Sequence, residues 1–147
     1  MDVTRFWWVR HGPTHEKAFT GWRDVPADLS DAAALGRLDA YLPQGAVLVS
    51  SDLIRAMATA DAVAGGRERL AHDAALRELH FGDWDGKHWA EVAASHPDLS
   101  RAYWEEPGDH CPPGGESWND LTARTWTALD RLQGQAPDLI SVAHFGP

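Results

Sequence analysis

The sequence predicts one α/β domain, a three-layer sandwich in which helices flank both faces of a mostly parallel central sheet. Two observations predict it. The chain has 147 residues, which is enough for one ordinary domain core and too few for two. Short apolar runs end in polar or glycine-containing turns and alternate with segments of helical composition, the pattern typical of strands and helices in a parallel sheet. We therefore treat residues 1–147 as a single domain.

The expected elements follow one another in this alternating order. Buried strands are expected at residues 6–9, 46–49 and 139–143. Helices are expected at residues 31–41, 52–64, 89–94 and 118–132, and in the last of these the apolar positions recur at helical spacing. Residues 65–86 and 107–117 are expected to be ordered loops, because they are rich in Gly and Pro or lack a periodic pattern.

Composition and charge exclude several classes of protein. The chain has 13 Lys and Arg against 22 Asp and Glu, a net charge of -9, so its overall field repels nucleic acid and anionic membranes. The single Cys111 excludes an internal disulfide, and the apolar run at the N-terminus is too short for a signal peptide or a membrane span. We expect a cytoplasmic protein that binds a small molecule, with neither nucleic acid nor membrane as a partner.

Two of the expected strands end in a histidine. The first strand is followed by Arg10, His11 and Gly12, and the last strand is followed by His144. Because ligand sites in open parallel sheets form at the carboxyl ends of strands, both histidines are expected at one edge of the sheet. Arg55 follows the middle strand in the first turn of a helix, where free N–H groups attract anions.

This constellation indicates a phosphate site inside an acidic protein. Phosphoryl transfer needs a nucleophile, donors for the equatorial oxygens and an acid for the leaving oxygen. His11 can be the nucleophile, while Arg10, Arg55 and His144 can be the donors. Taken alone, each has a structural alternative: His11 as a core or surface histidine, Arg10 as an ion-pair partner, and Arg55 as a partner of Asp52. The other histidines lack a paired metal-ligand spacing, so no metal and no cofactor are expected.

Five motifs in order then resemble a known family. They are Val-Arg-His-Gly after the first strand, Ser-Ser-Asp-Leu with Arg55 two residues later, Leu-Arg-Glu-Leu-His-Phe-Gly-Asp-Trp-Asp-Gly, Pro-Gly-Gly-Glu-Ser, and Val-Ala-His-Phe-Gly. Over residues 5–146 the chain resembles the histidine phosphatase (phosphoglycerate mutase-like) superfamily. The resemblance implies a phosphohistidine intermediate on His11, phosphate contacts from Arg10, Arg55 and His144, and Glu78 as the proton donor. Asp83 and Asp85 are nearby alternatives for that acid.

Some positions depart from the family pattern. Pro13, Thr14 and Lys17 stand where members often carry Glu, Thr or Ser, and Asn, and Asp85 stands where Glu is usual. Members also normally continue past the second histidine, so we expect the C-terminal part of the fold to be missing, which leaves an uncovered strand that could pair with another chain. Thr14, Thr20 and Gly21 are further candidates for phosphate or substrate binding, and Trp22, Trp84 and Trp104 are candidates for the substrate entrance.

The function expected is a metal-independent phosphomonoester hydrolase that acts on a small phosphorylated substrate. One alternative is a phosphoglycerate mutase-type phosphotransferase, although mutases of the family are generally longer. The other is a catalytically weak module that binds a phosphorylated ligand. The sequence does not identify the substrate, since the loops that would select it carry no readable code.

Overall fold

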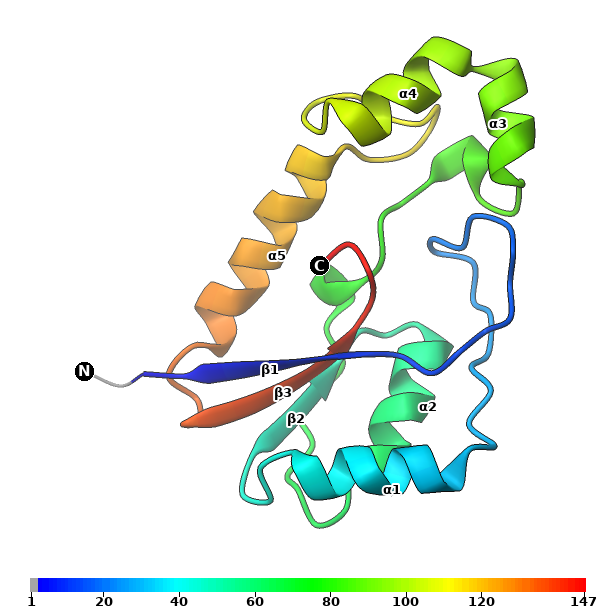
Figure 1. The fold of residues 1–147 in the computed structure, drawn as a ribbon. Helices are drawn as coiled ribbons and strands as arrows, with labels where there is room; N and C mark the ends of the chain where they lie inside the picture. The colour runs from blue at the N-terminus through cyan, green and yellow to red at the C-terminus, as the bar shows by residue number, and fades with distance from the viewer. Residues whose placement is uncertain (1–2) are drawn as a thin grey trace.

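The computed structural model describes residues 3–147, and its centre is a parallel sheet of three strands (Figure 1). The strands are β1 (Arg5–Arg10), β2 (Val47–Ser50) and β3 (Asp138–Ala143), in the spatial order β1-β3-β2. Ser141 of β3 lies between Trp8 of β1 and Val49 of β2. The strand with the longest buried run, β3, is therefore central, and the α/β prediction is confirmed.

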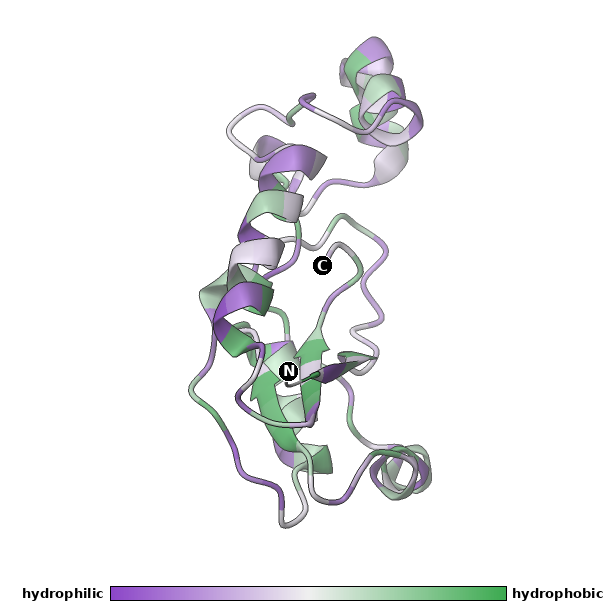
Figure 2. Ribbon diagram, turned by 90° about the vertical axis from the view of Figure 1, so that its left-hand side faces the viewer, coloured by the Kyte–Doolittle hydropathy of each residue, from purple (hydrophilic) through white to green (hydrophobic). Residues whose placement is uncertain are grey.

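Helices cover both faces of the sheet and produce three layers. Helices α1 (Ala32–Tyr41) and α2 (Ile54–Val63) pack on one face, where Ile140 and Val142 contact the small residues Ala56 and Ala60. Helix α5 (Trp118–Leu132) packs on the other face against Leu139 and Ala143. Figure 2 shows the strands as hydrophobic and the helices as mixed, as expected when only one side of each helix is buried.

A third hydrophobic cluster lies beyond the carboxyl ends of the strands. It joins a short 3₁₀ helix (Gly82–Trp84) to α3 (Trp89–Ser95), α4 (Pro97–Glu105) and the first turn of α5. Its fully buried members include Leu79, Trp84 and Tyr103. A second 3₁₀ helix (Ala74–Leu76) packs instead with α5 and β3. Helix α4 was not predicted from the sequence, and in it Pro97 occupies the first turn, where its missing N–H is not needed.

The start of α2 decides where Arg55 lies. The sequence suggested a helix from residue 52, but Leu53 is still extended and caps a helix that begins at Ile54. The Leu53 N–H lies 3.4 Å from Oγ of Ser51, and the Ile54 N–H donates to Asp24 at 2.7 Å. Arg55 is thus the second helical residue and points into the molecule.

Within residues 3–147, none of the helices is both long and apolar enough to cross a lipid bilayer.

Candidate active site

His11 and His144 meet at the carboxyl edge of the sheet, as the strand endings predicted. Arg10 pairs with Ala143 in the register of β1 and β3, and the backbone N–H of His11 donates to the carbonyl of Ala143 at 3.1 Å. The two imidazole centroids are 5.1 Å apart and the rings are tilted by 51°. Parallel pairing of two strands that each end in histidine is what brings residues so distant in sequence together.

The tautomer of His11 follows from one hydrogen bond. Its Nδ1 lies 2.7 Å from the carbonyl oxygen of Gly12, which can only accept, so Nδ1 carries the proton and Nε2 keeps a free lone pair. Burial lowers the pKa of His11 from 6.5 to about 4, with smaller contributions in the same direction from the charges of Arg55 and Arg10 and an opposing one from the Gly12 carbonyl. At neutral pH the imidazole is therefore uncharged and nucleophilic at Nε2.

His144 is held more deeply than His11. Its Nε2 is 2.6 Å from Oγ of Ser51, and its buried Nδ1 has no hydrogen-bond partner among the described residues. Burial, and then the charge of Arg55, lowers the pKa of His144 to about 2. The ring is neutral, and it lies beside His11 without lining the cavity described below.

Arg55 is fully buried and is held by carbonyl groups. Its Nη1 donates to the carbonyl of Arg23 at 2.8 Å, and its Nη2 donates to that of Gly21 at 2.6 Å. Nε finds no acceptor within residues 3–147. The pairing of Arg55 with Asp52 that the sequence left open does not form, because Asp52 accepts two hydrogen bonds of 2.6 Å from Arg77. Within the described part of the chain, Arg55 thus presents a positive charge without a direct carboxylate partner.

His11 and Arg55 border a cavity of about 280 Å³. Arg10, His11, Lys17 and Arg55 supply positive or nucleophilic groups, and Glu78 supplies a carboxyl. The remaining lining consists of a second carboxyl, Glu16, together with Thr14, Ala18, Phe19, Thr20, Phe81, Trp89 and Phe145. Three cations against the two carboxyls of Glu16 and Glu78 leave this cavity with a local positive charge, opposite to that of the chain as a whole, which favours binding of a phosphate dianion.

Glu78 is the buried carboxyl of the site. Its side chain points into the cavity, whereas Asp83 is exposed and Asp85 binds the backbone N–H groups of Gly21 and Arg23 at 3.1 Å. Oε1 of Glu78 accepts from the backbone N–H groups of Leu79 and Gly146, and Oε2 accepts from that of Phe145. Because Oε1 accepts two hydrogen bonds and Oε2 only one, a lone pair on Oε2 remains available for a proton.

Gly21 is a candidate that the structure does not bring to the cavity wall. Its carbonyl holds Arg55, and its N–H donates to Asp85. A Cβ at this position would lie 2.5 Å from the carbonyl oxygen of Leu79, so only glycine fits. Gly21 therefore shapes the loop behind Arg55, whereas Thr14 and Thr20 do line the cavity.

Sequence reasoning missed the aromatic side of the cavity. Trp89 and Phe145 line it and are 64% and 61% exposed. None of the three tryptophans considered for the entrance lines it: Trp22 stacks on His80 with centroids 4.1 Å apart, Trp84 is fully buried, and Trp104 stacks on Phe19. Position along the chain gave no signal for Trp89, since it lies at the start of a helix that only the tertiary fold turns toward His11.

Comparison with known proteins agrees with this geometry. The profile of the histidine phosphatase superfamily (branch 1) matches residues 6–147. A glucosyl-3-phosphoglycerate phosphatase of Mycolicibacterium vanbaalenii is 35% identical, with 99% of this chain aligned to 71% of that protein. A 2,3-bisphosphoglycerate-dependent phosphoglycerate mutase of Gloeobacter violaceus is also 35% identical, over 80% of this chain and 58% of the mutase.

Solved structures give the same result. The YhfR protein of Bacillus stearothermophilus is 30% identical and superimposes with a TM-score of 0.83, covering 98% of this chain and 75% of that one. A mycobacterial glucosyl-3-phosphoglycerate phosphatase is 31% identical with a TM-score of 0.80, covering 95% and 73% of the two chains. The family match, the two histidines at the sheet edge and the arginine-lined cavity lead to one conclusion: this chain belongs to the histidine phosphatase superfamily, branch 1.

Proposed function

We propose that this protein hydrolyses small phosphomonoesters through a phosphohistidine on His11. The observation that carries the proposal is the state of that ring. The carbonyl of Gly12 accepts a hydrogen bond from the Nδ1–H, and the pKa of about 4 keeps the imidazole neutral. The Nε2 lone pair is therefore available at neutral pH beside two arginines. A surface or structural histidine needs neither feature.

In the first step, Nε2 of His11 attacks phosphorus and the bond from phosphorus to the ester oxygen breaks. Arg10 and Arg55 stabilise the negative charge on the equatorial oxygens, with Lys17, Thr14 and Thr20 at the cavity wall as further donors. The departing alkoxide takes a proton from Oε2 of Glu78, the one carboxylate oxygen with a free position. The products of this step are a free alcohol and phosphohistidine.

In the second step, water attacks the phosphohistidine while Glu78, now a carboxylate, accepts a proton from the water. The bond from phosphorus to Nε2 breaks, inorganic phosphate leaves and His11 returns to its neutral state. We propose that His144, which is held by its contact with Ser51, acts as a neutral support for His11. Both steps use side chains of the protein alone, so we propose that the reaction needs no metal ion.

The cavity supports a small substrate. A volume of about 280 Å³ lies just below the usual range for ligand sites, which favours a phosphate with a compact alcohol. The named relatives include phosphatases of glucosyl-3-phosphoglycerate, which supports a phosphorylated metabolite as the substrate class. A cytoplasmic location, which the single cysteine suggested, is part of this proposal.

The test is phosphate release from 4-nitrophenyl phosphate in the presence of a metal chelator, with wild-type protein and His11→Ala. We expect turnover by the wild type, loss of at least about a thousandfold in the variant, and an acid-labile phosphoryl label that rapid quenching traps only on the wild type. His15→Ala is the matched control, because His15 lies four residues away and pairs with Asp28 outside the cavity. Activity that requires an added divalent metal would refute metal independence.

A mutase remains the second candidate, because two curated relatives are mutases that are 34% and 35% identical to this chain. A mutase returns the phosphoryl group to the substrate, whereas a hydrolase releases it to water. ³¹P NMR of 3-phosphoglycerate with the protein separates the two: appearance of 2-phosphoglycerate faster than inorganic phosphate would favour the mutase. Binding of phosphate without either product would favour a weak or inactive phosphate-binding module.

A further inference from the structure

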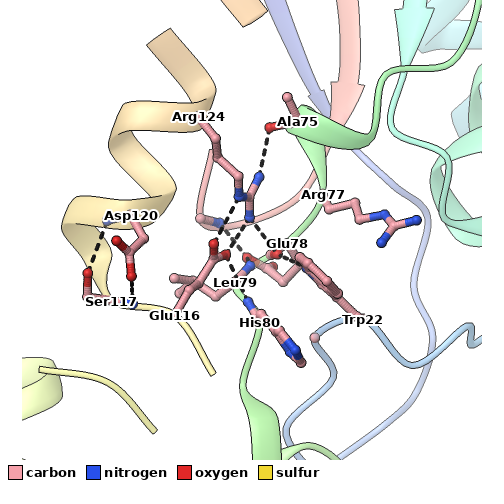
Figure 3. A network of polar contacts seen from close by, with 12 residues as sticks. Trp22, Ala75, Arg77, Glu78, Leu79, His80, Glu116, Ser117, Asp120 and Arg124 are labelled. Atoms are coloured by element: carbon pink, nitrogen blue, oxygen red, sulfur yellow. Dashed lines mark hydrogen bonds and ion pairs between the residues drawn. The ribbon is translucent and has the colours of Figure 1, made fainter. Parts of the chain in front are cut away.

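Arg124 holds the backbone of Glu78 from a position outside the cavity. It lies on α5, nearly two turns after the helix start that the Ser117–Asp120 capping box fixes. Its Nη2 donates to the main-chain carbonyl of Glu78 at 2.8 Å, and its Nη1 donates to that of Ala75 at 2.7 Å (Figure 3). One planar guanidinium thus binds two points of the segment that carries the carboxyl.

Glu116 completes this attachment. Arg124 binds it through two hydrogen bonds of 2.6 and 3.1 Å, from Nη2 and Nε. Oε1 of Glu116 accepts from the N–H of His80 at 2.9 Å, and the N–H of Glu116 donates to the carbonyl of His80 at 2.9 Å. The backbone on both sides of Glu78 is therefore tied to α5 and to the loop that precedes it.

A second group binds the same carbonyl from another part of the fold. Nε1 of Trp22 donates to the carbonyl of Glu78 at 2.8 Å. The indole is fixed between the His80 ring, at a centroid distance of 4.1 Å and 10° from parallel, and the guanidinium of Arg77, 4.8 Å from the ring centroid. In Figure 3 Arg124 and Trp22 approach Glu78 from different elements, so the carbonyl is clamped by two donors.

We propose that Arg124 is a positioning residue for Glu78 in the proton-transfer step, with Glu116 as the group that orients it. This inference rests on the proposed function. The supporting geometry is selective: Arg124 does not itself line the cavity, it meets the site at the backbone of Glu78, and its side chain is only 19% exposed. One donor of Arg124 binds the main-chain carbonyl of Glu78, the residue whose carboxyl faces the cavity. A purely structural link between two loops would not require this contact.

The kinetic test exploits the leaving group. Protonation by Glu78 matters little for 4-nitrophenyl phosphate, whose phenolate leaves readily, and matters greatly for an alkyl phosphate such as glycerol 3-phosphate. For Arg124→Gln we compare kcat/KM, which reports formation of the phosphohistidine and not its later hydrolysis, a step that both substrates share. We expect kcat/KM to fall about 10- to 100-fold on the alkyl phosphate and less than about threefold on the aryl phosphate. Arg124→Lys, which keeps the charge without the planar fork, should be intermediate.

The matched control is Arg131→Gln. Arg131 lies on the same helix, and its ion pair is with Asp73 at the surface. It should leave the ratio of the two rates at the wild-type value. Glu78→Gln sets the reference for complete loss of the acid and should show the same selectivity as Arg124→Gln, to a larger degree.

A second readout does not depend on turnover. The amide protons of Phe145 and Gly146 donate to the Glu78 carboxylate. In ¹H–¹⁵N spectra of Arg124→Gln both resonances should shift upfield as the carboxylate moves, and in Arg131→Gln they should not move. Unchanged amide resonances, or equal loss of rate on both phosphates, would overturn the positioning role. If the wild type turns over neither phosphate, the proposed function fails, and the amide resonances alone decide the role of Arg124.

Discussion

The carboxylate of Glu78 and the backbone of Gly146 are in direct contact: Oε1 accepts a hydrogen bond of 2.8 Å from the glycine N–H. This contact joins two segments 68 residues apart, the stretch that carries the candidate acid and the turn that follows β3. Because His144 also follows β3 directly, the positions of His144 and of the Glu78 carboxylate both depend on the end of this strand. A displacement at Gly146 must therefore be felt at Glu78.

Gly146→Ala tests this dependence. A Cβ at Gly146 would lie 2.7 Å from Oε1 of Glu78 and 2.9 Å from Cδ2 of Leu121, so one of these groups must move. We expect kcat/KM to fall by about 10- to 100-fold, because a displacement of around 1 Å at a reacting group is that costly. Steady-state kinetics on an alkyl phosphate measures it, with circular dichroism to verify folding.

The control for this change is Gly36→Ala in α1, where the added methyl group meets nothing within 4 Å. It should leave the rate unchanged and raise the free energy of unfolding by about 0.5–1 kcal/mol, since alanine is the better helix former. Wild-type activity in Gly146→Ala would mean that the contact with Glu78 is not needed for catalysis.

Arg55→Lys tests whether the site needs the planar guanidinium group of Arg55 or only its positive charge. Lysine cannot bind the carbonyls of Gly21 and Arg23 together while still presenting a donor to the cavity. We expect kcat/KM to fall by about a hundredfold and inorganic phosphate to inhibit more weakly as a product. The exposed Arg37 on α1, changed to lysine, is the control. Full activity in Arg55→Lys would contradict the proposed contact with phosphate.

Stability should decrease as the pH falls below about 6.5, because both site histidines are buried in the neutral form. The pKa of His144 is lowered to about 2 and that of His11 to about 4. Between these values and pH 6.5 the two histidines bind protons in the unfolded chain and do not bind them in the folded chain. This stabilising effect is complete above pH 6.5 and is lost progressively between about pH 6.5 and the folded-state pKa values. For His144 the loss approaches about 1.4 kcal/mol per pH unit, and it is smaller for the partly exposed His11.

Urea denaturation at pH 7, 6 and 5 measures this effect. The comparison with His144→Gln isolates the histidine, since glutamine does not titrate and the carboxylates contribute equally to both proteins. The slope of unfolding free energy against pH should be smaller in the variant. Equal slopes would show that His144 is not buried in its neutral form.

Arg67 offers a prediction about stability without function. Its side chain is 1% exposed and donates to the carbonyls of Pro43, Leu42 and Val63, as well as to Asp39. Arg67→Ala leaves these buried acceptors unpaired, and we expect the free energy of unfolding to fall by about 3–5 kcal/mol. The measurement is urea denaturation, with the exposed Arg101→Ala as control, for which the change should be below about 0.5 kcal/mol. Below the unfolding transition, kcat should be unchanged.

Local patterns in the sequence determined the strands and most of the helices. Alternation and apolar runs are local properties, so the strand ends at Arg10 and Ala143 could be located, and with them the two histidines. Parallel pairing then required those histidines to share one edge. Helix α4 was not predicted, because the burial of Tyr103 depends on contacts with Phe81 and Trp84, which lie about 20 residues earlier in the sequence.

Only the tertiary structure decided which of the candidate side chains face the cavity. The sequence offered Glu78, Asp83 and Asp85 within eight residues, and the fold turned Glu78 inward by giving its carboxylate the N–H groups of Phe145 and Gly146. It likewise turned His144 toward Ser51 and brought Trp89 to the wall. The physical reason is that a residue type and its spacing set what a side chain can do, whereas its orientation is set by partners far away along the chain.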